Sequence, residues 1–283
     1  MLKFLKNWTL PLAMFAGAIG YFLLANVTIL EPAKPFVNWL IAVLTPFLIF
    51  AQLLLTFCKI EPKELLPKAW HVWLLSIQAV SSGIIALLLI FCPMEEAYRD
   101  IFEGAMVCLI CPTATAAAVI TGKLGGSAST LTTYTLLSNV LAAIAVPLVF
   151  PLVEPHADIT FVVAFLKILS KVFPLLLAPF FIALLFRYYI PSVHRLLSKY
   201  HGVAFSLWAV ALTIVTGQTV RSLVTAAADV SIEIMIALAG LATCCLQFYF
   251  GKRIGSAYHD RISAGQALGQ KNTVLAIWMA VTY

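Results

Sequence analysis

The chain has 283 residues, of which 62% are apolar and only 11% are charged, and its net charge is +6. Soluble globular domains carry about 25% charged residues, so this composition excludes an ordinary soluble protein. Charge-poor apolar runs recur along the chain, each long enough to cross ~30 Å of hydrocarbon as a helix. The sequence therefore predicts an all-α integral membrane protein. We attribute its positive charge to cytoplasmic loops and expect no nucleic-acid partner.

Nine apolar runs are candidate membrane spans. They cover residues 8–28, 36–58, 70–92, 102–122, 130–153, 172–190, 203–224, 230–250 and 263–283. The first run lacks a small-residue cleavage pattern, so we expect a span rather than a cleaved signal peptide. Before the sixth run, Lys167 and Lys171 stand four positions apart. This spacing predicts a separate helix in the membrane interface, with the chain turning into the membrane at Pro174.

Basic residues between the spans indicate the orientation. With the N-terminus in the cytoplasm, Lys271 falls inside a span and twelve of the 18 lysines and arginines face the cytoplasm. The outer side then carries only Lys34, Arg99, Lys167, Lys171 and Arg221. We therefore expect a multi-pass protein of the plasma (inner) membrane with a cytoplasmic N-terminus. Nine spans leave Tyr283 outside, so a tenth span is absent; either the sequence is truncated or the protein works with nine.

The fourth and ninth runs are each interrupted near their centre. Pro112 stands in the fourth run, and proline removes a backbone donor and clashes with the carbonyl four residues earlier. Gly269 interrupts the ninth run and is followed by Gln270, Lys271 and Asn272. A single proline kink is common in membrane helices. Interrupted helices five spans apart, however, are typical of transporters built from inverted repeats.

This spacing divides a single transmembrane domain, residues 1–283, into two repeats. The first covers about 1–153, and the second, incomplete repeat covers about 158–283. At each break the second half-helix begins with free N–H groups and a partial positive charge. These breaks favour an anionic group near the midplane of the membrane.

Three stretches of the sequence resemble the bile acid/sodium symporter family. They are 111-CPTATAAAVITGKLGGSASTLTTYTLLSNVLAAIAVPLV-149, 269-GQKNTVLA-276 and Gln78 within 74-LLSIQAV-80. The resemblance implies inverted five-helix repeats arranged as a panel and a core, with spans 4 and 9 broken and crossing. It also implies transport of organic anions, such as bile acids, pantothenate precursors or 2-oxoacids, usually coupled to sodium.

The resemblance also implies candidate site residues. Thr113 and Asn272 match positions that contact the organic anion in the family. Thr115, Ser129 and Thr133 match hydroxyl ligands of the family's first sodium site. Hydroxyl and carbonyl oxygens are the ligands that hard cations such as sodium prefer.

The sodium-site pattern is altered in this chain. Ala116 replaces an asparagine, Ala267 replaces a glutamate shared by both sites, and Lys271 replaces a glutamine of the second site. A one-residue slip would place Gln270 there instead. Gln78 keeps its place in the third span. The family's carboxylate is therefore lost, and an ammonium group has been added.

Lys271 and a sodium ion would compete for the same site. Two like unit charges about 4 Å apart repel by ~4 kcal/mol at an effective dielectric constant of 20. One interpretation is that Lys271 stands in for the bound cation and donates to Gln78 and to backbone carbonyls freed at the breaks. The other is a structural lysine that permanently holds the crossover. We expect no cofactor, and the altered residues argue against sodium.

The expected function is secondary transport of small organic anions by alternating access, not catalysis. An alternative is a cation/proton antiporter of related fold, although no span carries the core aspartate that it normally needs. Another is a transport-inactive membrane sensor that binds the ligand. Gln218 and Asn139 are polar residues within spans, and we expect them to make helix-packing hydrogen bonds.

Overall fold

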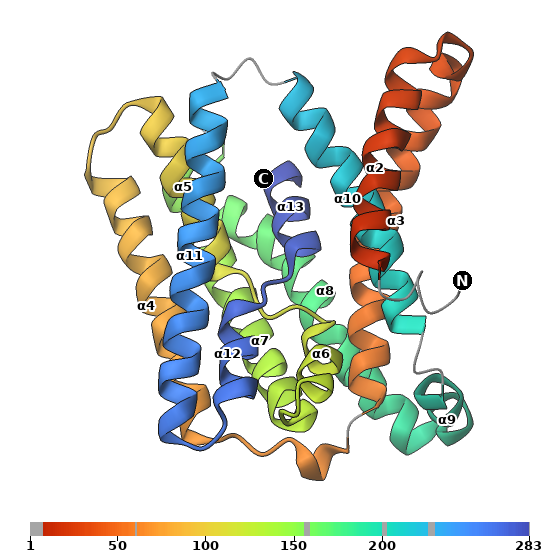
Figure 1. Ribbon diagram of the computed structural model, residues 1–283, viewed down its shortest axis with the longest axis vertical. Coiled ribbons are helices and arrows are strands. Elements are labelled where there is room, and N and C mark those ends of the chain that lie inside the picture. Colours follow the sequence, from red (N-terminus) through yellow and green to blue (C-terminus); the bar gives the residue numbers. More distant parts are fainter. Residues whose placement is uncertain (1–7, 60, 156–158, 200–202, 226–229, 283) are drawn as a thin grey trace.

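The protein is a helical bundle, seen here in a computed structural model that describes residues 8–59, 61–155, 159–199, 203–225 and 230–282. Seven helical segments in these ranges are long and apolar enough to cross a membrane. Their helices are α2 (Thr9–Asn26), α3 (Lys34–Cys58), α4 (Ala69–Phe91), α7 (Ala128–Val153), α8 (Phe161–Tyr189), α10 (Val203–Thr225) and α11 (Val230–Ala257). Most run along the long axis of the bundle (Figure 1). Large apolar side chains such as Phe15 and Phe91 are exposed on its outside, as expected for a surface that faces lipid.

The fourth and ninth apolar runs are each folded as two helices. The fourth contains α5 (Glu96–Ile110) and α6 (Ala117–Lys123), and the ninth contains α12 (Arg261–Gly269) and α13 (Thr273–Thr282). The two non-helical connections meet near the middle of the bundle (Figure 1). Half-helices of this kind leave backbone groups unpaired, and protein groups must satisfy them at membrane depth.

The prediction of a separate interfacial helix before the sixth run is wrong. Helix α8 continues from Phe161 to Tyr189 through Pro174. Ala164, Ile168, Val172 and Leu176 are all buried, so one apolar stripe of helical period extends across the proline. Packing along this stripe keeps the helix continuous, because a proline costs a membrane helix little once neighbouring groups satisfy the freed carbonyl.

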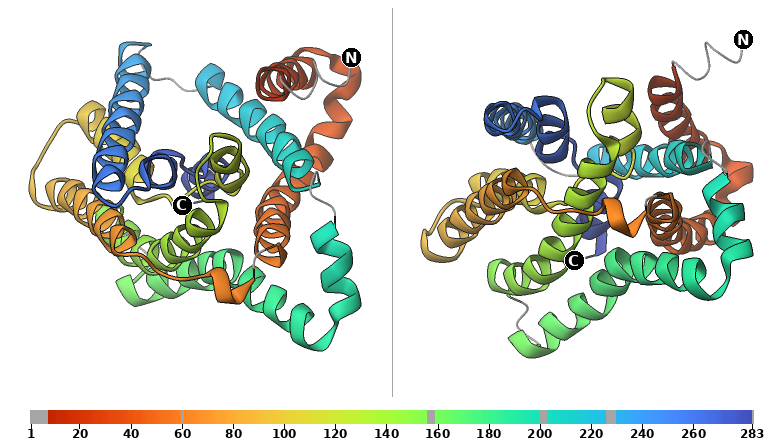
Figure 2. Two further views of the ribbon diagram at one scale, coloured as in Figure 1. Left: turned by 60° about the horizontal axis from the view of Figure 1, so that its bottom comes forward. Right: turned by 90° about the horizontal axis from the view of Figure 1, so that it is seen from below.

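The helices pack as two groups. Helices α4, α5, α6, α7, α11 and α12 contact one another and are called the core group, whereas α2, α3, α8 and α10 form the panel group. Figure 2 shows the groups side by side, with α7 and α8 in contact where they meet. Helix α13 contacts α3 and α10 as well as α5. A large apolar cluster that includes Leu53, Cys111, Leu176 and Leu275 fills the boundary.

Candidate functional site

The two helix breaks cross as a short antiparallel pair of extended segments. The Ala114 N–H donates to the Gln270 carbonyl at 2.9 Å, and the Asn272 N–H donates to the Pro112 carbonyl at 2.9 Å. Helix α5 ends two residues before Pro112, and α12 ends at Gly269. Backbone groups released by one break are thus satisfied by the other. We call this region the crossover (residues 111–116 and 270–272).

The C-terminal end of α5 is satisfied by side chains from elsewhere in the fold. The last four carbonyls of a helix have no partner within it. Gln78 Nε2, from α4, donates to the Ile110 carbonyl at 2.9 Å and to the Cys111 carbonyl at 3.2 Å. Gln78 Oε1 in turn accepts a hydrogen bond of 3.2 Å from the Tyr134 hydroxyl. This glutamine therefore fixes α4, α5 and α7 to one another.

Two further donors complete the capping of α5. Gln247 Nε2, from α11, donates to the Cys108 carbonyl at 3.3 Å. Lys271 Nζ donates to the Leu109 carbonyl at 3.2 Å. The Gln78 side chain bonds to other groups, so the expected hydrogen bond from Lys271 to Gln78 is not present in the described residues. Lys271 does donate to a backbone carbonyl freed at a break, as the same interpretation expects. Its ammonium lies where the helix dipole of α5 carries partial negative charge.

Thr113 and Asn272 already make structural hydrogen bonds. The buried Thr113 hydroxyl donates to the Ala267 carbonyl at 2.6 Å, and its N–H donates to Ser138 Oγ at 3.2 Å. Asn272 Oδ1 accepts from the Leu275 N–H at 3.2 Å and so caps α13. Thr113 thus ties the fourth-run break to α12 and α7, and Asn272 begins the second half of the ninth run.

The three candidate cation-site hydroxyls occupy different surroundings. The Thr115 hydroxyl, at the fourth-run break, donates to Gln52 Oε1 on α3 at 2.9 Å. The buried Thr133 donates within its own helix to the Ser129 carbonyl. Ser129 is partly exposed near the start of α7 and donates to the Glu64 carbonyl. The hydrogen bonds found in the described residues do not join Thr115 to either of the other two.

Sequence reasoning missed Gln52 and Gln247. The signal that could have found them is a glutamine within an apolar run, where leucine would insert more easily. The hydrogen bond expected of Asn139 is not present in the described structure, where both amide atoms are buried without a partner.

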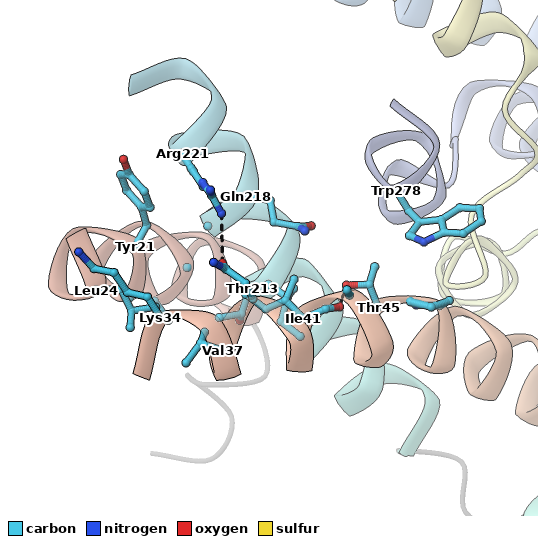
Figure 3. Close-up of a pocket in the computed structure, with 18 of the residues that line it drawn as sticks. Tyr21, Leu24, Lys34, Val37, Ile41, Thr45, Thr213, Gln218, Arg221 and Trp278 are labelled. Atoms are coloured by element: carbon cyan, nitrogen blue, oxygen red, sulfur yellow. Dashed lines mark hydrogen bonds between the residues drawn. The ribbon is translucent and has the colours of Figure 1, made fainter. Parts of the chain in front are cut away.

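A cavity of about 1030 Å³ lies between α2, α3, α8, α10 and α13. Its lining includes Lys34, Lys171 and Arg221, and the lining residues described by the structure include no aspartate or glutamate. Figure 3 shows Lys34 and Arg221 at one end and Trp278 towards the other. Arg221 Nη1 donates to the Asn38 side chain at 3.1 Å. Neither Thr113 nor Asn272 lines this cavity.

An ion pair joins the N-terminal ends of two core helices, α4 and α12. Lys68 Nζ, just before α4, lies 3.0 Å from Asp260 Oδ2, just before α12. Burial by itself raises the pKa of the Asp260 carboxyl. Hydrogen bonds from Ser263 and Lys68, together with the charge of Lys68, outweigh burial and hold that pKa below its ordinary value. The carboxylate is thus kept charged where α12 begins.

A comparison with protein families identifies the family to which this chain belongs. The model of the Sodium Bile acid symporter family matches residues 3–226, which is more than half of the chain. The chain belongs to this family. The symporter-family match includes the fourth-run break and ends before α11, so the ninth-run residues lie outside it. No curated protein gives a match. The family and the apolar helices together describe a transmembrane protein of a transporter family.

Proposed function

We propose that the protein is a secondary transporter of small organic anions that works by alternating access. The observation that carries this proposal is the crossing of two broken helices at the boundary between two helix groups. Such crossings place the ends of half-helices and their backbone dipoles at membrane depth, where a substrate can replace protein partners. Membership of a family of transporters supports the same conclusion, and it favours transport over catalysis.

The substrate is an anion with an apolar part, of the bile acid, pantothenate-like or 2-oxoacid class. The cavity supports this proposal, because it combines Lys34, Lys171 and Arg221 with an apolar lining that includes Ile41 and Trp278. Basic residues inside a low-dielectric cleft raise the local concentration of anions. We retain Thr113 and Asn272 as substrate-binding residues that become accessible when the core and panel groups separate.

We further propose that transport does not require sodium, because Lys271 replaces a bound cation. Its bond to the Leu109 carbonyl puts a positive charge at the C-terminal end of α5. Ala267 and Ala116 supply no side-chain oxygen where the family has a carboxylate and an amide. Transport is a uniport if Lys271 stays charged throughout, and is proton-coupled if the lysine releases its proton in one conformation.

The proposed placement is the inner membrane with the N-terminus in the cytoplasm. The two repeats, about 1–153 and 158–283, are inserted in opposite directions. This arrangement is supported by broken helices at corresponding places in the two repeats and by the excess of basic residues on the cytoplasmic side.

The experiment that tests the proposal is uptake into proteoliposomes. Radiolabelled glycocholate, pantoate and pyruvate are offered with and without sodium, across pH, against empty liposomes. We expect saturable uptake of at least one probe that is unchanged by sodium. Binding without uptake would favour the sensor, and probe-independent sodium/proton exchange would favour the antiporter.

The Lys271→Gln variant tests the cation replacement. We expect it to lose uptake or to become sodium-dependent, whereas Lys63→Gln, at an exposed position, leaves uptake unchanged. Wild-type affinity that rises several-fold with sodium would overturn the sodium-independent mechanism while leaving the transport function in place.

A further inference from the structure

A glutamine of the panel group reaches the crossover. Gln52 lies in the second half of α3 and is 3% exposed. Its Oε1 accepts the hydrogen bond from the Thr115 hydroxyl at 2.9 Å. Thr115 belongs to the fourth-run break, so this bond joins the panel group directly to the segment that the proposed substrate approaches.

The other half of the same amide lacks a partner among the residues that the structure describes. Gln52 Nε2 is buried there without a hydrogen bond. A donor buried without a partner is destabilising, and such groups are rare in native proteins. The cost is greatest in a membrane span, where water cannot satisfy the donor. A partner that arrives in another state of the protein would satisfy this donor.

The chemistry of the site identifies that partner as an acceptor. Gln52 Oε1 already accepts from Thr115, and the amide atom left without a partner in the described residues is the donor Nε2. A neutral N–H beside a proposed anion site makes a short, charge-assisted bond to a carboxylate oxygen. Because the amide carries no charge of its own, it can also lose this ligand without leaving an unpaired ion in the membrane.

We propose that Gln52 is a specificity-determining residue that donates from Nε2 to a carboxylate oxygen of the substrate at the fourth-run break. This inference rests on the proposed transport function. It adds a panel residue to a site otherwise assigned to Thr113 and Asn272. The substrate carboxylate then bridges the two helix groups. The hydrogen bond from Gln52 therefore distinguishes substrates that have a carboxylate from those that lack one.

The test compares three variants in lipid nanodiscs, with equilibrium binding of glycocholate, pantoate and pyruvate as the measurement. Gln52→Met removes both polar atoms at similar volume. Thr115→Val removes only the bond to Oε1. Thr56→Val is the matched control, because Thr56 lies one turn further along α3 and its hydroxyl donates to the backbone carbonyl of Gln52, not to its side-chain amide.

We expect Gln52→Met to weaken binding of whichever probe the wild type binds by about tenfold or more, since a bond to a charged group is lost. Thr115→Val should change affinity by less than about threefold, and Thr56→Val should not change it. The wild type should also prefer the carboxylate to its methyl ester, and Gln52→Met should lose that preference. A purely structural role would not alter this selectivity.

Several outcomes would overturn the inference. Unchanged binding in Gln52→Met defeats it and leaves the transport function standing. Equal losses in Gln52→Met and Thr115→Val would mean that Gln52 acts only by holding Thr115. A wild type that binds none of the probes defeats the proposed function and this inference together. If Gln52→Met fails to fold, Gln52→Leu replaces it, since this variant also removes the donor, and it must show the same loss.

Discussion

The two breaks cross as a pair, yet they are stabilised in different ways. Helix α13, after the ninth-run break, begins with the side-chain cap of Asn272. Helix α6, after the fourth-run break, begins at Ala117, and its N-cap residue Ala116 provides no side-chain cap. The end of α5 before that break is instead held by Gln78, Gln247 and Lys271. One break is thus set largely by its own sequence, and the other depends on residues distant in the chain.

The largest effect is expected for Gln78→Leu. This change removes the donor to two carbonyls and the acceptor of the Tyr134 hydroxyl, which should lower the free energy of unfolding by about 3 kcal/mol. Chemical unfolding in detergent measures the effect. Ser82→Ala is the control, because that hydroxyl donates to carbonyls of its own helix. If Gln78→Leu lowered the free energy of unfolding no more than Ser82→Ala does, the fourth-run break would not depend on Gln78.

Lys271→Met should have the next largest effect. It leaves the Leu109 carbonyl without its charged donor, at a cost of about 2 kcal/mol in unfolding free energy. Lys271→Gln keeps a donor and should recover part of that loss. A shift in thermal unfolding temperature provides the measurement. If both variants unfold at the wild-type temperature, the lysine does not stabilise the crossover.

Asn272→Ala should cost about 1 kcal/mol, the usual value of a helix N-cap. The loss should be local to α13, because the cap is the Leu275 N–H bond. Hydrogen exchange followed by mass spectrometry would detect faster exchange at the start of α13. Asn272→Ser retains a capping oxygen and should exchange like the wild type. If the start of α13 exchanged as slowly in Asn272→Ala as in the wild type, the ninth-run break would not be stabilised by its own residues.

The smallest effect concerns Asp260, at the start of the ninth-run pair. Its folded-state pKa lies below the ordinary value of 3.8, so its stabilisation is fully present above that pH and is lost as the pH falls through the folded pKa. The loss should stay below about 1 kcal/mol, as for partly exposed ion pairs. Unfolding measured from pH 6 to pH 2 tests this, and Asp260→Asn should remove that part of the pH dependence. A wild type that became more stable as the pH fell from 6 to 2 would contradict this prediction.

The sequence is most informative where a residue acts on its own backbone. Composition predicts helices in a membrane, and Pro112 and Gly269 interrupt helices through local chemistry. The same reasoning failed at Pro174, because the buried stripe of α8 overrides a local preference. The bond from Lys271 to the Leu109 carbonyl, and that from Thr115 to Gln52, depend on how separate helices cross. No spacing in the chain encodes either pair, so the capping of α5 and the role of the panel group required the structure.

The close approach of α2 and α10 has a mechanical consequence. A Cβ atom added at Gly17 would lie 2.2 Å from the Thr213 carbonyl oxygen, and one at Gly217 would lie 3.1 Å from the Gly17 carbonyl oxygen. Backbones packed this closely resist sliding, as small-residue contacts do in membrane helices. We therefore expect α2 and α10 to move together as one rigid unit. In the proposed transport cycle, the cavity that they line would widen or narrow by displacement of α13 and the core group against these two helices, not by parting them.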